Sequence, residues 1–400
     1  MPNASGSYKQ IVIKKQPTAG TLPGATGARI VSRTDGVFNL AKDVLANDRI
    51  RSDLQPSEGR HGVRSVTGNI NDHLAPGNSS DLLGTALKRA FAAVAPMTGL
   101  SITIASVAGG YTLTRSTGSW LTSGLRIGMG IRLTAGTFNA ANLNKTLFVT
   151  DVTALTATVV AANGSALVAE GPIATATVTV PGKYSYMPTT GHLDEFYTVE
   201  EWQPDVPFSE VYTDWRPISS DFSIPASGNA TLSIQGEGRD LAQRGATRYF
   251  TTPTAENNNP VLAGVNGVLR VAGEAYSVTS LTFQLATPFS GEACLGDSVR
   301  KNRFAESPTV TGSFTAYFDG GVLPALFYDE TVTSIDLLMT ADNTAACEFM
   351  TFSLNRVKVN SSDKDSGRGG VLRTYSFTAS LPPAAGAREQ TTLAIQDSLA

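Results

Sequence analysis

"SVTGNINDHL" at residues 65–74 and "TVTGSFTAYF" at residues 309–318 open with the same Val-Thr-Gly motif. Apolar residues then recur at every second position in both copies, which is the period of a half-buried β-strand. The apolar positions are Ile70 and Leu74 in the first copy, with Asp72 as an exception, and Phe314, Ala316 and Phe318 in the second. The recurrence of one motif so far apart in the chain suggests an internal duplication.

The segments around the two motifs also recur in one order. Six matched segments indicate two related β-domains, and a duplicated chain readily builds rings with twice the apparent symmetry of its subunit count. The matched pairs are 35–44 with 276–289, 65–74 with 309–318, 79–95 with 321–330, 195–202 with 333–341, 211–225 with 347–360, and 230–238 with 373–380.

The composition favours short strands joined by turns. Glycine and proline are frequent, at 38 and 20 residues, and helical periodicity is nearly absent. The exception is "SSDLLGTALKRAFAAVA", which predicts a helix over Ser79–Ala95, capped by Ser79 or Ser80 and with Asp81 in its first turn. Its apolar stripe predicts that the helix lies on a β-sheet.

A second type of sequence interrupts the first β-domain. Residues 97–185 contain short alternating segments with few charges and a turn about every ten residues, which is typical of a small closed β-barrel. We therefore predict a mainly β fold of two related β-sandwich or barrel domains, the first with a flanking helix and an inserted barrel. The predicted parts are an extended N-terminal arm (1–30), domain 1 in two pieces (31–96 and 186–240), the inserted barrel (97–185) and domain 2 (241–400).

Charge and chemistry exclude several classes of function. The 31 Lys and Arg residues are balanced by 34 Asp and Glu residues, which argues against a protein that grips nucleic acid electrostatically. No secretory signal and no membrane span are evident, so we expect synthesis in a cytoplasm. Cys294 and Cys347, expected as reduced buried thiols with a disulfide as the alternative, and three scattered histidines form no metal pattern.

An enzyme requires clustered titratable groups, and none is visible. Glu200 and Glu201 are neighbours on an alternating segment and point to opposite faces, so we predict a surface or pore-lining role for them. No cofactor is expected. The three tryptophans could form a sugar-binding platform, but packing in a core or interface is the favoured interpretation, with Trp120 closing one end of the barrel.

The order of elements resembles the tail tube (major tail) proteins of long, non-contractile-tailed bacteriophages. The segments that carry the resemblance are "LLGTALKRAF" after "SVTGNIN", "GSWLTSGLRIGMGIRLTAGTFNAANLNKTLFVTDVTALTATVV", "FYTVEEW" with "ISSDFSIPASGNATLSIQGEG", and "SLNRVKVN", "YSFTAS" and "TTLAIQD". The resemblance implies a structural virion protein, made in the host cytoplasm, whose rings stack around a channel for DNA. It also implies contact with a tape-measure protein and with tail terminator and distal tail proteins, and no catalytic residues.

Two domains per chain favour a ring of three chains with pseudo-six-fold symmetry, with a hexamer as the alternative. The inserted barrel is then expected on the exterior. Exposed strand edges and loops suit contacts between rings. The candidates lie in the arm and in the loop from Asp43 to Glu58, whose alternating charges could pair between subunits or merely keep the loop soluble: Tyr8, Ile11, Ile13, Asp48, Arg49, Arg51 and Asp53.

The alternative class is a binding module, a β-sandwich adhesin or carbohydrate-binding protein with the barrel as its recognition domain. Such a module requires a cluster of exposed aromatic side chains and a stable monomer. The tube protein and the binding module therefore differ in whether the chain assembles.

Overall fold

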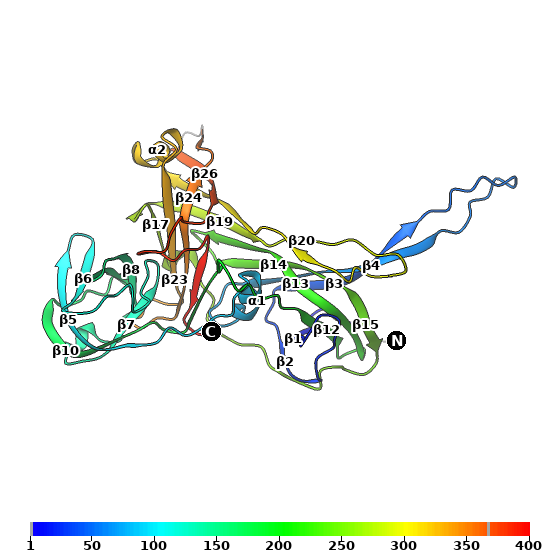
Figure 1. The fold of residues 1–400 in the computed structure, drawn as a ribbon, viewed down its shortest axis with the longest axis horizontal. Helices are drawn as coiled ribbons and strands as arrows, with labels where there is room; N and C mark the ends of the chain where they lie inside the picture. The colour runs from blue at the N-terminus through cyan, green and yellow to red at the C-terminus, as the bar shows by residue number, and fades with distance from the viewer. Residues whose placement is uncertain (1–2, 366–368) are drawn as a thin grey trace.

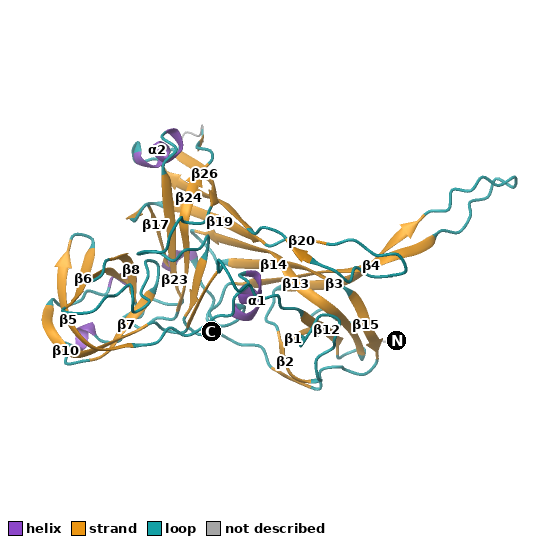
Figure 2. Cartoon of the chain, viewed as in Figure 1, coloured by secondary structure: helices purple, strands orange, loops and turns teal. Residues whose placement is uncertain are grey.

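A computed structural model describes residues 3–365 and 369–400 of the chain. The fold is mainly β, with two short α-helices in these residues (Figure 2). A small closed barrel lies at one end of the long axis of the molecule, and a hairpin projects from the other end (Figure 1). The predicted fold class is confirmed.

One antiparallel sheet runs through the molecule, and we call it the shared sheet. A single row of paired residues crosses all of its strands, from Gly36 to Val357. The strands, in their order across the sheet, are β3 (Asp35–Leu45), β4 (Arg60–His73), β14 (Thr231–Gly238), β13 (Phe208–Pro225), β19 (Val278–Ala286), β22 (Thr309–Tyr317), β26 (Leu372–Ala379) and β24 (Phe349–Val359), with the short β25 (Asp363–Lys364) beside β26 beyond the end of β24.

Two further sheets cover one face of the shared sheet and enclose the main apolar core with it. Strands β13 and β24 are bent into both layers, since their first halves pair within the covering sheets. The first covering sheet contains β16 (Thr252–Thr254), β2 (Thr26–Ile30), β1 (Gln10–Lys15), β12 (Tyr197–Gln203), β13 and β15 (Asp240–Gly245). The second contains β18 (Glu274–Ala275), β17 (Gly267–Val271), β23 (Val332–Thr340), β24, β27 (Ala394–Asp397) and β11 (Lys183–Tyr186).

The strand pairing of the first half is repeated in the second half. The ladder β3–β4–β14–β13 matches β19–β22–β26–β24, and the neighbours β12, β1 and β15 match β23, β17 and β27. Helix α1 (Ser80–Ala86) follows β4, and helix α2 (Val322–Tyr328) follows β22. The six segment pairs matched in the sequence therefore occupy matching places in the fold.

The structure also explains the glycine of the repeated motif. Gly68 faces the ring of Phe38 on the next strand, and a Cβ at Gly68 would lie only 2.2 Å from that ring. A Cβ at Gly312 would likewise lie 2.6 Å from the ring of Phe377. Only glycine leaves room for the aromatic ring of the neighbouring strand at these two positions.

The inserted segment forms a closed barrel. Its chain enters and leaves from the first half, but the barrel packs on the second half, where Phe148 joins an apolar cluster with Phe349 and the Gly130 N–H donates to Oε1 of Gln396 at 2.8 Å. Trp120 is fully buried in the barrel core, as expected for packing. The barrel strands are β5 (Met97–Val107), β6 (Gly110–Arg115), β7 (Gly130–Ala135), β8 (Leu147–Val152), β9 (Thr156–Ala161) and β10 (Glu170–Thr179).

The helix predicted over Ser79–Ala95 is much shorter than expected. It ends at Ala86 because Lys88 adopts a left-handed backbone with φ of 56°, and the N–H groups of Lys88 and Arg89 bond back to the carbonyls of Thr85 and Gly84. This is a Schellman ending, which glycine usually provides. The cap is also different, since the Ser79 side chain makes no capping hydrogen bond.

The two halves meet in a cluster of phenylalanine rings in the main core. Phe222 on β13 stacks on Phe283 of β19 with ring centroids 4.5 Å apart, and it meets the edge of Phe352 on β24 at 5.2 Å. The two strands that join the halves are thus held by both hydrogen bonds and aromatic packing.

We predict that Phe222→Ala lowers the free energy of unfolding by about 3–5 kcal/mol, because a large buried ring is lost and a cavity remains. Urea unfolding followed by circular dichroism measures the change. The control is Val265→Ala, at a side chain that is 78% exposed, which should change stability by less than about 0.5 kcal/mol. Equal effects of the two variants would contradict this role of Phe222.

Candidate assembly surfaces

The uncovered face of the shared sheet is polar. One row on this face runs through side chains of all its strands. Two pairs of neighbours in the row are hydrogen-bonded: the Ser233 hydroxyl donates to Asn71 at 2.6 Å, and the Gln284 amide donates to Asp221 at 2.5 Å. The full row is Asp35, Asn71, Ser233, Asp221, Gln284, Thr311, Thr378 and Lys358.

Two shallow grooves lie on this polar face and share Ser233: the first lies over the first half, and the second lies across the line where the two halves meet. Hydroxyl and amide side chains dominate their lining. The charged residues that line them are Glu237 in one groove and Asp221 in the other, and both are acidic. The two grooves are hydrated and their lining offers no cation to a phosphate, while the one basic member of the row, Lys358 at its end, is paired with Glu330 at 2.7 Å. The sequence analysis did not identify this face, although alternate Ser, Thr, Asn and Gln residues on six strands were a visible signal.

A long hairpin formed by β3 and β4 projects beyond the body of the molecule (Figure 1). Its tip exposes two large apolar side chains, Ile50 at 101% and Leu54 at 93% of their full surface. The predicted loop residues Arg51 and Asp53 form an ion pair with each other at 2.6 Å. The remaining candidates of this loop, Asp48 and Arg49, also lie at the tip.

The N-terminal segment does not behave as a free arm. Strand β1 lies between β12 and β2, and Ile11 and Ile13 are buried in the main core of their own chain. The prediction that these two residues contact another ring is therefore wrong, because the chain itself supplies the surface that orders them. Tyr8, just before the strand, is 63% exposed and stays a candidate.

The paired glutamates point to opposite faces of β12, as expected, but both are buried, so a surface or pore-lining role is wrong. Glu200 accepts the N–H groups of Tyr249 and Phe250 at 2.6 and 3.0 Å. Glu201 accepts a hydrogen bond from the N–H of Phe38 on β3 and forms an ion pair with Lys9 at 2.9 Å. Burial raises the pKa of the Glu201 carboxyl, and the Lys9 ammonium and the Phe38 N–H oppose this shift.

The metal-binding potential of the chain can be assessed in the part that the structure describes. Residues 3–365 and 369–400 contain no group of three or more His, Cys, Asp or Glu side chains able to hold a metal ion. Both cysteines are free, and Cys294 is exposed, which corrects the expectation that both thiols are buried. Within the same residues, no helix is both long and apolar enough to span a bilayer.

The fold defines a β-rich protein with a long polar sheet face and a projecting hairpin, which is the character of a structural subunit. A family model described as phage tail tube protein matches residues 6–379. The chain belongs to this family, so it is a structural tail protein and a component of the virion. A search of curated proteins found no match to the chain.

We predict that Glu201 makes stability depend on pH. Because the pKa of Glu201 is higher in the folded than in the unfolded chain, folding takes up a proton between these two values, and this contribution to stability falls as pH rises through the interval. The variant Glu201→Gln has no titratable carboxyl at this position, so its stability lacks this dependence on pH. Urea midpoints at pH 4, 5, 6 and 7 should show the wild type losing stability relative to the variant as pH rises, whereas parallel curves would refute the shift.

Proposed function

We propose that this chain polymerises as stacked rings into the phage tail tube and that the polar face of the shared sheet lines the channel through which DNA passes. The observation that carries the proposal is the single sheet that extends through both halves with one face covered and one face polar. A closed ring of such sheets would enclose a hydrated lumen.

The chemistry of the polar face suits a conduit. A protein that neutralises phosphates gains affinity for DNA with each contact, and such affinity would slow passage. The acidic Asp221 and Glu237 among hydroxyl and amide groups keep the lumen free of that attraction. DNA would therefore move through the channel without specific binding.

Three chains per ring agree best with the duplication. Each chain supplies two equivalent ladders of four strands, so three chains supply six such ladders in pseudo-six-fold symmetry. A hexamer would hold twelve ladders and a much wider lumen. We accordingly favour the trimer.

The inserted barrel would lie outside this lumen. The barrel rests on β24 and β27 of the second covering sheet, on the side of the molecule away from the polar face, so it would decorate the exterior. We divide the chain as predicted, into two tube domains by duplication with the barrel of residues 97–185 inserted in the first. Tape-measure, terminator and distal tail proteins remain the expected partners, with assembly in the host cytoplasm and no catalysis.

Mass by light scattering, with negative-stain images of the same fractions at rising concentration, tests the proposal. Rings or tubes with a central channel and three chains per ring are expected. A chain that stays monomeric throughout, even when mixed with the distal tail complex as an initiator, would refute the tube.

The hairpin is proposed to join one ring to the next, with Asp48, Arg49, Arg51 and Asp53 at the contact and Tyr8 as a further candidate. Ile50→Asp with Leu54→Asp should leave the chain folded, because both side chains are exposed, and should allow rings while preventing stacking. Images should then show single rings in place of tubes.

The matched control for the hairpin variant is Leu155→Asp, which changes a 45% exposed side chain on the barrel. This variant should form tubes of ordinary length. Full-length tubes from the hairpin variant would exclude the tip from the contact between rings.

A further inference from the structure

The duplication makes two connections equivalent, and both leave the shared sheet at the same end. The first joins β3 to β4 after the Ala41–Ser65 pair and forms the projecting hairpin, and the second joins β19 to β22 after the Ala286–Thr309 pair. The two connections, residues 42–64 and 287–308, are nearly equal in length. The second connection is therefore long enough to form a hairpin of the same reach.

The second connection is instead folded against its own chain. The Arg303 guanidinium donates to the Asp214 carbonyl on β13 at 3.2 Å and to the Gly238 carbonyl at the end of β14 at 2.5 Å. The guanidinium groups of Arg303 and Arg216 both lie over the Phe289 ring, 4.8 and 4.0 Å from its centroid. Hydrogen bonds and cation–π contacts therefore fix the position of this connection on the body.

The folded connection runs to the root of the projecting hairpin. Arg64 of β4 donates its N–H to the Ser298 carbonyl at 2.8 Å, and it forms a parallel bridge with the buried Val299. Strand β14 pairs with β4 only as far as Val66, so this part of the connection takes the next place beside β4. Figure 1 shows the connection, in yellow, next to β4, and it shows that the hairpin reaches farther.

The tip of the second connection is apolar, like the tip of the hairpin. Leu295 follows Ala286 at the same interval at which Ile50 follows Ala41. Both side chains are fully exposed, at 107% for Leu295 and 101% for Ile50. Equivalent positions with equally exposed apolar side chains indicate a related role for the two tips.

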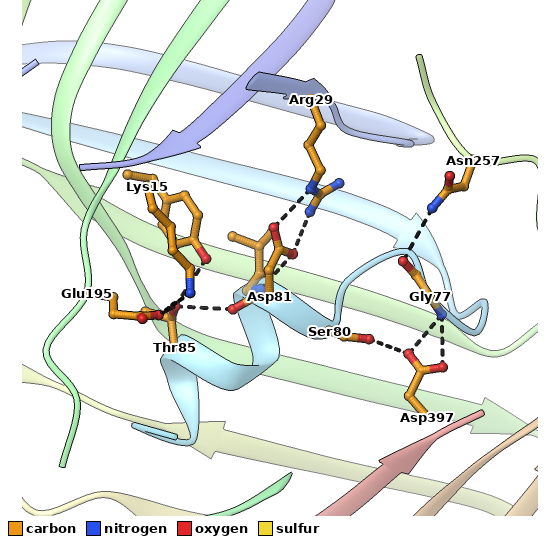
Figure 3. A network of polar contacts seen from close by, with 11 residues as sticks. Lys15, Arg29, Gly77, Ser80, Asp81, Thr85, Glu195, Asn257 and Asp397 are labelled. Carbon is orange, nitrogen blue, oxygen red and sulfur yellow. Dashed lines mark hydrogen bonds and ion pairs between the residues drawn. The ribbon is translucent and has the colours of Figure 1, made fainter. Parts of the chain in front are cut away.

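The two helices lie at the other end of the same strands, because α1 follows the end of β4 and α2 follows the end of β22. Helix α1 is buried along most of its length by its own chain. Arg29 of β2 pairs with Asp81 at 2.6 Å (Figure 3). The carboxylate of Asp397 on β27 accepts the Gly77 N–H at 2.8 Å and the Ser80 hydroxyl, which makes a joint between the halves.

Helix α2, in contrast, leaves apolar side chains uncovered. Val322, Phe327 and Tyr328 are exposed at 61%, 36% and 62%. Phe318 and Val371 are exposed at 44% and 47%, and the Phe318 N–H bonds to the Val371 carbonyl beside the helix. We call these five residues the α2 patch. Clustered exposed apolar side chains of this kind mark an interaction site.

We infer that the connection of residues 287–308 in one copy docks on the α2 patch of a second copy in the next ring, with Leu295 as its apolar anchor. The inference rests on the proposed stacking of rings. The connection and the patch lie at opposite ends of β19 and β22, so copies stacked along these strands bring the two surfaces together. A contact between two different surfaces of one chain repeats along a filament without closing.

Charge complementarity supports this docking. Asp319 and Asp329 flank α2 and are exposed, and Arg300 is exposed on the second connection. The arginine therefore offers a basic partner to the acidic flanks of the patch.

The contact between rings would then differ for the two halves of the chain. The hairpin reaches past the second connection, so the two equivalent connections would meet different parts of the next ring. Helix α1 is covered and α2 is not, so each chain offers one receiving patch. The docking would repeat once per chain, although the chain contains two related halves.

Leu295→Asp tests the anchor, at an exposed side chain whose change should leave the chain folded by circular dichroism. We expect single rings, or tubes only at about tenfold more protein, as for truncation of an interface anchor. The matched control is Leu155→Asp on the barrel, which should form tubes like the wild type. Ordinary tubes from Leu295→Asp would overturn this docking and leave the tube function in place, whereas a wild-type chain that never assembles would refute the function itself.

A mixing experiment tests whether the two surfaces meet each other. The α2 variant, Val322→Glu with Tyr328→Glu, should also stop at single rings, while the control Val107→Glu on the barrel should form tubes. Rings of Leu295→Asp keep an intact patch, and rings of the α2 variant keep an intact connection. Mixed together, they should form pairs of rings that grow no further, with twice the mass of one ring by light scattering. Rings of the two variants that stay single when mixed would overturn the docking of these surfaces.

Discussion

The hydrogen-bonded pairing of β13 with β19 is the interaction on which the rest of the structure depends. It converts two equivalent ladders into one continuous sheet, and the stacked rings of Phe222 and Phe283 hold the two strands in register. Without this pairing, the covering sheets would enclose two separate cores, and the polar face would be interrupted at its middle. The single large core and the continuous polar surface are both consequences of one strand-to-strand contact.

The two faces of the shared sheet have different roles. Its covered face supplies stability through aromatic and aliphatic packing, while its open face presents hydroxyl, amide and acidic groups to solvent. Because side chains alternate along every strand, a single stretch of sequence serves both tasks at once. A continuous sheet with this division suits a structural protein of the phage tail.

The sequence was sufficient for the fold class and for the order of the repeated segments, since strand periodicity and the repeated motif with Gly68 and Gly312 are local signals. It was insufficient where tertiary contacts decide. Lys88 ends α1 in a left-handed backbone conformation that the residue type does not predict. The pairing of β1 that buries Ile11 depends in part on β12, nearly two hundred residues away. Glu200 appeared suited to the surface, but backbone N–H groups brought together by folding satisfy its carboxylate in the interior.

The place of the barrel within the chain has a consequence for the order of folding. The segment that leaves the barrel continues into β11, and β11 joins the second covering sheet by pairing with β27. The two strands are separated by the whole second half. During synthesis β11 can form its bridge from Tyr184 to Ala92, but its ladder with β27 can form only after residues 394–397 have emerged from the ribosome. The joint at Gly77 and Ser80 also depends on Asp397. Completion of the first half is therefore tied to the last part of the second, which delays a finished subunit surface until the two halves can fold as one body.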